Sequence, residues 1–150
     1  IVGSGPVYPN SARIVSVQDD EIMVSFSSGN DVVLIRMDTA GNIIWERKFE
    51  GERLDISVGG IQTLDGHYLL LANTSSYGNG EFDVMLTKVD RQGEIIWDKV
   101  YGGTESDAAF KVVEKANGDL LVLGNVKREI TSLSETNLFI LETDREGNPK

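Results

Sequence analysis

The sequence has no cysteine and only one histidine, His67, in 150 residues. The absence of cysteine excludes disulfides, thiolate metal ligands and cysteine nucleophiles, while leaving the cellular compartment undecided. A single histidine disfavours a Ser-His-Asp triad and a multi-histidine metal centre. We therefore expect neither a bound metal nor a cofactor, and we assign no catalytic residue.

Basic residues are also few, with 14 Lys and Arg against 24 Asp and Glu and a formal net charge of −10. A surface of this sign repels phosphate backbones, so we expect no nucleic-acid partner. The acids are scattered rather than gathered into a tail, which favours a solvated acidic surface.

No apolar run approaches the roughly 18 residues of a membrane helix, so no membrane-spanning segment is expected. The first ten residues lack the basic and long apolar regions of a signal peptide, which indicates that an export signal is either removed or absent. With 40% apolar and 25% charged residues, the composition is that of a globular protein, and residues 1–150 are expected to form one domain.

What the sequence does contain is an internal repeat. Residues 31–45, DVVLIRMDTAGNIIW, return 52 residues later as residues 83–97, DVMLTKVDRQGEIIW, and residues 64–74 map onto 116–126 at the same offset. A third copy begins at residues 137–148, offset by 54, and residues 13–28 match the stretch around 61–74 at an offset of 46. Self-similarity at a fixed period is the signature of a repeat architecture.

Each copy holds short runs of β-branched and aromatic residues separated by Gly, Asn and Asp turns, with no helical period. The predicted strands are 12–18, 21–28, 31–38 and 42–49, then 57–63, 67–74, 82–90 and 94–101, then 108–115, 119–126 and 136–144. The units span about 12–49, 57–101 and 108–150, the last one incomplete. We expect an all-β chain without a helix longer than one turn.

Runs such as VVLI, YLLLA and LFIL are almost continuously apolar, as in a sheet whose two faces are both covered. A two-sheet sandwich would show alternation, and a β-solenoid has shorter, parallel rungs. Four-stranded antiparallel units of about 50 residues are typical of β-propeller blades. The sequence thus predicts about three blades, in a partial ring or one completed by an oligomer, whose edges serve protein or self-association.

The pattern D-V-x-L-x-(R/K)-x-D-x-x-G-(N/E)-I-I-W, then an aromatic residue, a glycine-rich stretch and an aspartate, resembles the quinoprotein-like β-propeller repeats. It is most similar to archaeal and bacterial surface proteins whose blades read lDs-GnilW-ktyGG-D-a, and it covers nearly the whole chain. Residues 101–107, YGGTESD, keep the pattern, whereas residues 49–55, FEGERLD, depart from it. The resemblance implies a propeller fold and an extracellular or cell-surface location, and such repeats accompany many functions.

Trp45 and Trp97 each follow two isoleucines at the same repeat position. A large ring there can cover the seam to a neighbouring blade while its N–H finds a carbonyl. In the quinoprotein-like repeats, which these residues resemble, the tryptophan docks blades together. The alternative role is an aromatic platform for a sugar.

The turns between the third and fourth strands share an opening aspartate and a glycine three residues later. The aspartate can accept backbone N–H groups, and the glycine can adopt the positive φ that closes the hairpin. These turns offer too few oxygen ligands at alternate positions for calcium. The residues with these structural roles are Asp38, Asp90, Asp144, Gly41, Gly93 and Gly147.

One position near the end of the third strand carries charges of both signs, namely Arg36, Lys88 and Glu142. This mixture disfavours a shared ligand site. We expect separate ion pairs or surface roles there.

Binding in propellers is expected where loops converge, here in residues 27–30, 50–55, 74–82, 102–107 and 126–137. Tyr77 and Asn79 place an aromatic ring and an amide in a glycine-rich loop, a pair suited to sugar contact. Asp55 and Asp107 precede a first strand, where capping or blade-to-blade hydrogen bonding is expected and a ligand role is the alternative.

We expect a non-enzymatic scaffold or binding module of a cell-surface or secreted protein, acting through protein–protein contact or self-association. Two alternatives stay open: a carbohydrate-binding, lectin-like module that takes a glycan, and a fragment of a propeller enzyme such as a quinoprotein dehydrogenase. A propeller enzyme aims convergent charged or metal-ligating residues at its axis, and the sequence reveals no carboxylates clustered at glycosidase spacing.

Removal of calcium or zinc with a chelator should leave the melting temperature unchanged, because no turn assembles a full ligand set and His67 is the only histidine. Differential scanning calorimetry with and without a chelator measures this. A fall of several degrees on chelation would contradict the expectation.

Overall fold

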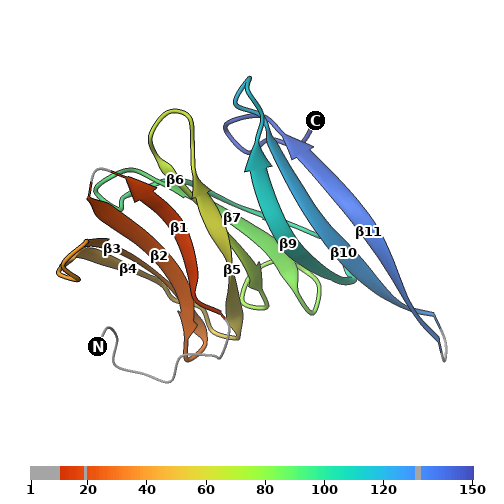
Figure 1. Cartoon of the computed structure of the whole chain (residues 1–150). Helices are drawn as coiled ribbons and strands as arrows, with labels where there is room; N and C mark the ends of the chain where they lie inside the picture. The colour runs from red at the N-terminus through yellow and green to blue at the C-terminus, as the bar shows by residue number, and fades with distance from the viewer. Residues whose placement is uncertain (1–10, 19, 131–132) are drawn as a thin grey trace.

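The computed structural model of the protein describes residues 11–18, 20–130 and 133–150. Eleven strands form three antiparallel sheets of four, four and three strands, standing side by side in chain order (Figure 1). No helix occurs in these residues, and hence none that is long and apolar enough to cross a membrane. The all-β expectation is confirmed.

Each sheet is a meander of consecutive strands. Sheet 1 contains β1 (Arg13–Gln18), β2 (Glu21–Ser28), β3 (Asp31–Asp38) and β4 (Ile43–Phe49); sheet 2 contains β5 (Asp55–Gln62), β6 (Tyr68–Thr74), β7 (Asp83–Val89) and β8 (Ile95–Tyr101); sheet 3 contains β9 (Ser106–Glu114), β10 (Leu120–Ile130) and β11 (Leu133–Thr143). Strands β1 to β9 lie within two residues of their predicted bounds. No closed sheet forms within the described residues.

The last hairpin is longer than predicted. Strands β10 and β11 pair from Leu120 and Thr143 to Ile130 and Leu133, so the prediction of a loop over residues 126–137 is wrong for most of its length. The equivalent residues of sheet 2, 74–82, include two glycines, whereas residues 126–137 include neither glycine nor proline. Because nothing in this stretch interrupts the ladder, the two strands continue to pair.

Sheet 2 lies between the other two sheets, and both faces of its central strands β6 and β7 are buried. All seven residues of β7 are buried, including the polar Asp83, Thr87 and Lys88 as well as its apolar residues. The cluster between sheets 1 and 2 comprises Met23, Val32, Leu34, Tyr68, Leu70, Ala72, Met85 and Val89. The cluster between sheets 2 and 3 comprises Leu69, Leu71, Val84, Leu86, Ala109, Val112, Leu120 and Val122.

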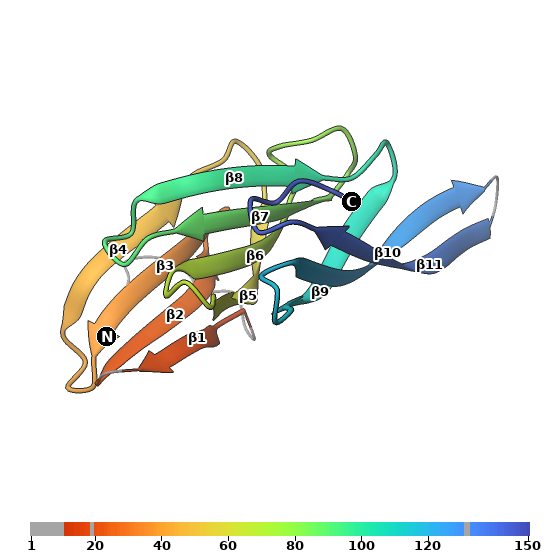
Figure 2. The same ribbon diagram turned by 90° about the horizontal axis from the view of Figure 1, so that it is seen from above.

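The first strands of the three sheets are neighbours. Strand β5 contacts β1 and β2 of sheet 1 and β9 of sheet 3. Figure 2 shows β1, β5 and β9 along one side of the molecule and the fourth strands β4 and β8 along the other. We refer to β1, β5 and β9 as the inner strands.

A tryptophan on the fourth strand of each four-stranded sheet contacts the next sheet. Trp45 on β4 donates its indole N–H to the carbonyl of Arg91, 2.9 Å away in the turn between β7 and β8. A Cβ at Gly93, in the same turn, would lie 3.1 Å from the Trp45 ring. Trp97 on β8 lies near Gly147, whose Cβ would be 3.1 Å from the ring and 2.9 Å from the Tyr101 hydroxyl. Both rings are partly buried at these seams.

Three equivalent turns, two of which lie against a tryptophan, are held by their own aspartates. Each turn aspartate accepts the backbone N–H of the residue four positions later, at 2.7–2.9 Å. The three turn glycines have φ between 78° and 89°, a conformation that favours glycine. The pairs are Asp38 with Asn42, Asp90 with Glu94 and Asp144 with Asn148.

We expect Gly93→Ala to reduce the free energy of unfolding by about 1–2 kcal/mol more than Gly41→Ala does. Both glycines have similar positive φ, 84° and 89°, so both variants carry the same left-handed strain. Only at Gly93 would the added Cβ press on Trp45, since nothing lies within 4 Å of a Cβ at Gly41. Urea unfolding of the two variants measures the difference.

The same comparison in a Trp45→Ala background is the control. Without the indole ring, Gly93→Ala and Gly41→Ala should cost the same, because the crowding at the seam is gone. Equal losses in the chain that retains Trp45 would show that the Trp45 ring does not pack closely on the turn of Gly93.

Candidate functional site

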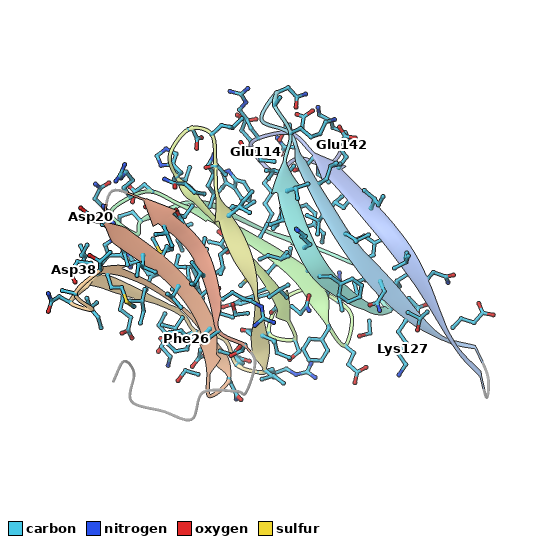
Figure 3. The ribbon with its side chains drawn as sticks, viewed as in Figure 1. Asp20, Phe26, Asp38, Glu114, Lys127 and Glu142 are labelled. Carbon is cyan, nitrogen blue, oxygen red and sulfur yellow. The ribbon has the colours of Figure 1, made fainter. Side chains whose placement is uncertain are left out.

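The loops named as a binding region lie at one end of the sheets. In Figure 3, Phe26 and Lys127 lie toward this loop end, whereas Asp20, Asp38, Glu114 and Glu142 lie at the opposite end of their sheets. The loop end therefore gathers the connections between second and third strands and those between successive sheets.

Asp55 is buried and ties three segments together at the loop end. Its Oδ1 accepts the hydroxyl of Thr74 at 2.6 Å and the backbone N–H groups of Ser75 and Ser76 at 3.2 and 3.3 Å. Its own N–H donates to the carbonyl of Asn30 in sheet 1, 2.8 Å away. The side chain is 1% exposed, and its contacts orient the loop backbone. Asp55 is the first residue of β5 rather than the residue before it.

Asp107 repeats part of this arrangement one sheet further on. Its Oδ2 accepts the N–H of Gly103 at 3.0 Å, and its own N–H donates to the carbonyl of Phe82 at 2.7 Å. A Cβ at Gly102 would lie only 1.9 Å from Oδ1 of the buried Asp83, so this position requires glycine. Asp107 lies inside β9, one residue after its start, and joins sheet 3 to sheet 2.

Tyr77 presents a half-exposed ring on a fixed loop. Its hydroxyl donates to the carbonyl of Glu50 at 2.8 Å, and its backbone N–H donates to Oγ1 of Thr74 at 3.2 Å. Thr74 therefore joins Tyr77 to Asp55, while the ring remains 48% exposed. Asn79 is exposed, and no hydrogen bond between described residues links it or Asp107 to this group. Of the four candidate ligand residues, the structure brings Tyr77 and Asp55 together.

The inner strands line most of an open hollow that the sequence alone does not predict. Its volume is about 410 Å³, and its lining includes Ile14, Gly59, Phe110 and Lys111. Ile14 and Phe110 are 68% and 50% exposed. The repeat does contain a signal for this hollow. Arg13, Gly59 and Lys111 hold the same repeat position, so two cationic residues lie on one side of an acidic chain. Such a lining suits a ligand with an apolar part and an anionic part.

An ion pair recurs at the end of each sheet that lies opposite the loops. In every case the charged residue near the end of the third strand pairs with a residue at the hairpin of the first two strands. The sign is reversed in sheet 3, but the pairing is kept. The pairs are Arg36 with Glu21, Lys88 with Asp65 at 2.6 Å, and Glu142 with Lys115 at 2.9 Å.

The pair in sheet 2 lowers the pKa of its aspartate. The side chain of Lys88 is 7% exposed, whereas that of Asp65 is 48% exposed. Burial opposes ionisation of Asp65, but hydrogen bonds from Lys88, Thr63 and His67 outweigh it and lower the pKa of Asp65 to about 2. Asp65 is therefore a structural counter-ion for Lys88.

Within residues 11–18, 20–130 and 133–150, no three His, Cys, Asp or Glu side chains gather in a way that could hold a metal. His67, the histidine that precedes Tyr68 of β6, is half-buried. Its Nδ1 is buried and has no hydrogen-bond partner among the described residues.

No protein-family model and no curated protein matches this sequence. The likeness to the quinoprotein-like repeats rests on the repeat pattern alone.

Replacing Asp65 by Asn should lower the free energy of unfolding near neutral pH by about 1–2 kcal/mol, because the buried Lys88 ammonium loses its counter-ion and half-exposed Asp65 is partly screened. The folded pKa of about 2 lies below the ordinary value of 3.8, so this stabilisation is complete above 3.8 and is lost as the pH falls toward 2. Urea unfolding of both proteins across this pH range checks the sign.

Glu94→Gln is the matched control. Glu94 pairs with Arg47 at 2.5 Å, but its side chain is 72% exposed, so its loss should cost less than about 0.5 kcal/mol. A deficit of Asp65→Asn that stays constant from neutral to acid pH would contradict the assigned role.

Proposed function

We propose that this chain is a non-enzymatic β-propeller-type repeat scaffold that acts through contacts between protein sheets. The observation that carries the proposal is the contact between successive sheets, which is made twice with equivalent residues. Trp45 meets the turn of Gly93, and Trp97 meets the turn of Gly147. A repeat that builds the same interface each time is suited to extension by further protein.

The recurring polar residues support a structural role. The three turn aspartates bind the backbone of their own turns, and Asp55 and Asp107 orient loop backbone and join sheets. The charges at the mixed-sign position pair inside their own sheets. The recurring polar residues are thus engaged in contacts within their sheets or, for Asp55 and Asp107, also between sheets.

A location outside the cell or at its surface belongs to this proposal and is supported by the likeness to the surface-protein repeats. The acidic composition, with a net charge of −10, is compatible with a solvated surface of this kind. Protein is accordingly the partner class that we propose.

A carbohydrate-binding module is the second candidate, and one observation favours it. The Tyr77 ring is 48% exposed and held in place by its hydroxyl and backbone hydrogen bonds. An immobilised aromatic ring loses little entropy when a sugar stacks on it. Asn79, two residues away, would add an amide.

As a scaffold, the three sheets should unfold as one cooperative unit. Trp45→Phe and Trp97→Phe each leave one tryptophan, so fluorescence then reports on one seam at a time. In each variant, we expect the urea midpoint measured by tryptophan fluorescence to coincide with the midpoint measured by circular dichroism. Separate transitions would show independent sheets and contradict a scaffold.

Glycan-array binding and dye reduction after reconstitution with pyrroloquinoline quinone test the two alternatives. We expect neither signal. Glycan binding that is lost in Tyr77→Ala but kept in Phe110→Ala would establish the lectin-like function instead, since Phe110 is equally exposed but lies on an inner strand. Quinone-dependent dye reduction would establish an enzyme.

A further inference from the structure

Sheet 3 exposes a broad apolar face. The face consists of Val113, Leu121, Leu123, Leu138 and Ile140, and we call it the open face. Leu138 and Ile140 are 75% and 72% exposed, and Val113 and Leu123 are 42% and 41% exposed. In Figure 1, sheet 3 ends the row, with no described strand beyond it. Contiguous apolar surface of this kind marks an interaction site on soluble proteins.

The strand register places these residues on one side of the sheet. Leu123 pairs with Ile140 and with an inner-strand lysine, and Leu121 pairs with Val113. Residues directly opposite one another, and those two positions apart, share a face of a sheet. The alternate residues of β10 and β11, among them Leu120, Val122 and Phe139, pack on sheet 2.

The same repeat positions are buried in the other two sheets. Leu69, Leu71, Val84 and Leu86 of sheet 2 correspond to Leu121, Leu123, Leu138 and Ile140, at offsets of 52 and 54. They are at most 1% exposed, because sheet 3 covers them. In sheet 1, the corresponding residues Met23, Val32 and Leu34 are at most 2% exposed, because sheet 2 covers them.

The ion pair at the end of the face shows the same difference. Lys88 and Glu142 hold the same repeat position, one in sheet 2 and one in sheet 3. The Lys88 side chain is 7% exposed beneath its neighbours, whereas the Glu142 side chain is 40% exposed. The open face thus exposes residues at repeat positions that are buried in sheets 1 and 2.

We infer that the open face is a docking surface for a further antiparallel sheet of the same repeat, seated as sheet 3 is seated on sheet 2. This inference rests on the proposed scaffold function and names its partner. The docking sheet carries large apolar residues at the positions of Leu120, Val122 and Phe139, which are the residues that cover sheet 2 here.

A second copy of the chain fits this surface less well. Docking in the same sense would use the outward face of sheet 1, but Phe26, Val33 and Ile35 of that face are only 7%, 3% and 0% exposed. Docking through two open faces would join identical repeat positions. In both seams of the chain, the face equivalent to the open face instead packs against the opposite face of the next sheet.

The test extends the full chain and uses a thiol as a reporter. Residues 97–150 are repeated once after Lys150, which supplies a fourth strand for sheet 3 and one further unit. Because the chain has no cysteine, Ile140→Cys introduces a single thiol on the open face. Ile44→Cys, at a site that is 48% exposed on β4 of sheet 1, is the control.

We expect the extension to slow labelling of the thiol at position 140 by at least about tenfold, since the equivalent Leu86 is fully buried. Labelling at position 44 should not change. Changing the residue equivalent to Val122 in the appended unit to Glu should restore fast labelling at position 140, because a charge there would be buried without a partner.

Equal labelling at position 140 with and without the extension would overturn the inference, whether the appended unit folds elsewhere or stays unfolded. Protection that appears in the unextended chain and rises with its concentration would also overturn it, because a second copy would then be the occupant. Neither result bears on cooperative unfolding or on the glycan and quinone assays, which test the scaffold function separately.

Discussion

The structure depends on burying both faces of sheet 2. Every residue of β7 is buried, and Leu69 and Leu70, adjacent on β6, face opposite neighbours. An isolated sheet with two apolar faces would expose both to water, so the three sheets are stable only as a stack. The seams, the loop contacts and the open face are consequences of that requirement.

Stacking also accounts for the polar residues that recur in the repeat. When the ends of the sheets come together, backbone N–H groups of the loops are removed from water and need acceptors. The buried carboxylate of Asp55 supplies one oxygen to two such groups and to the hydroxyl of Thr74. Likewise, Trp45 satisfies its indole N–H with the Arg91 carbonyl of the next sheet. The polar contacts thus set the order and alignment of sheets that apolar packing alone would leave free to slide.

The differences between units lie where the stack does not constrain them. The connection between second and third strands is a tight turn in sheet 1, a glycine-rich loop with Tyr77 in sheet 2 and a long ribbon in sheet 3. The inner-strand position is Arg13, Gly59 and Lys111 in turn. The variation between units is therefore concentrated at the loop end and the inner hollow, while the repeated residues make the contacts within and between the sheets.

The sequence alone determined the strands and turns, because their causes are local. The alternation of β-rich runs with Asp-x-x-Gly turns places β1 to β9 within two residues, and it identifies Gly41, Gly93 and Gly147 as turn glycines. Tertiary structure decided the rest, because it joins residues far apart in the chain. The carbonyl that accepts the indole N–H of Trp45 lies 46 residues away, and the inner hollow is lined by residues from all three sheets. The exposure of Leu138 and the burial of the equivalent Val84 depend only on whether another sheet lies against them, which no property of either residue encodes.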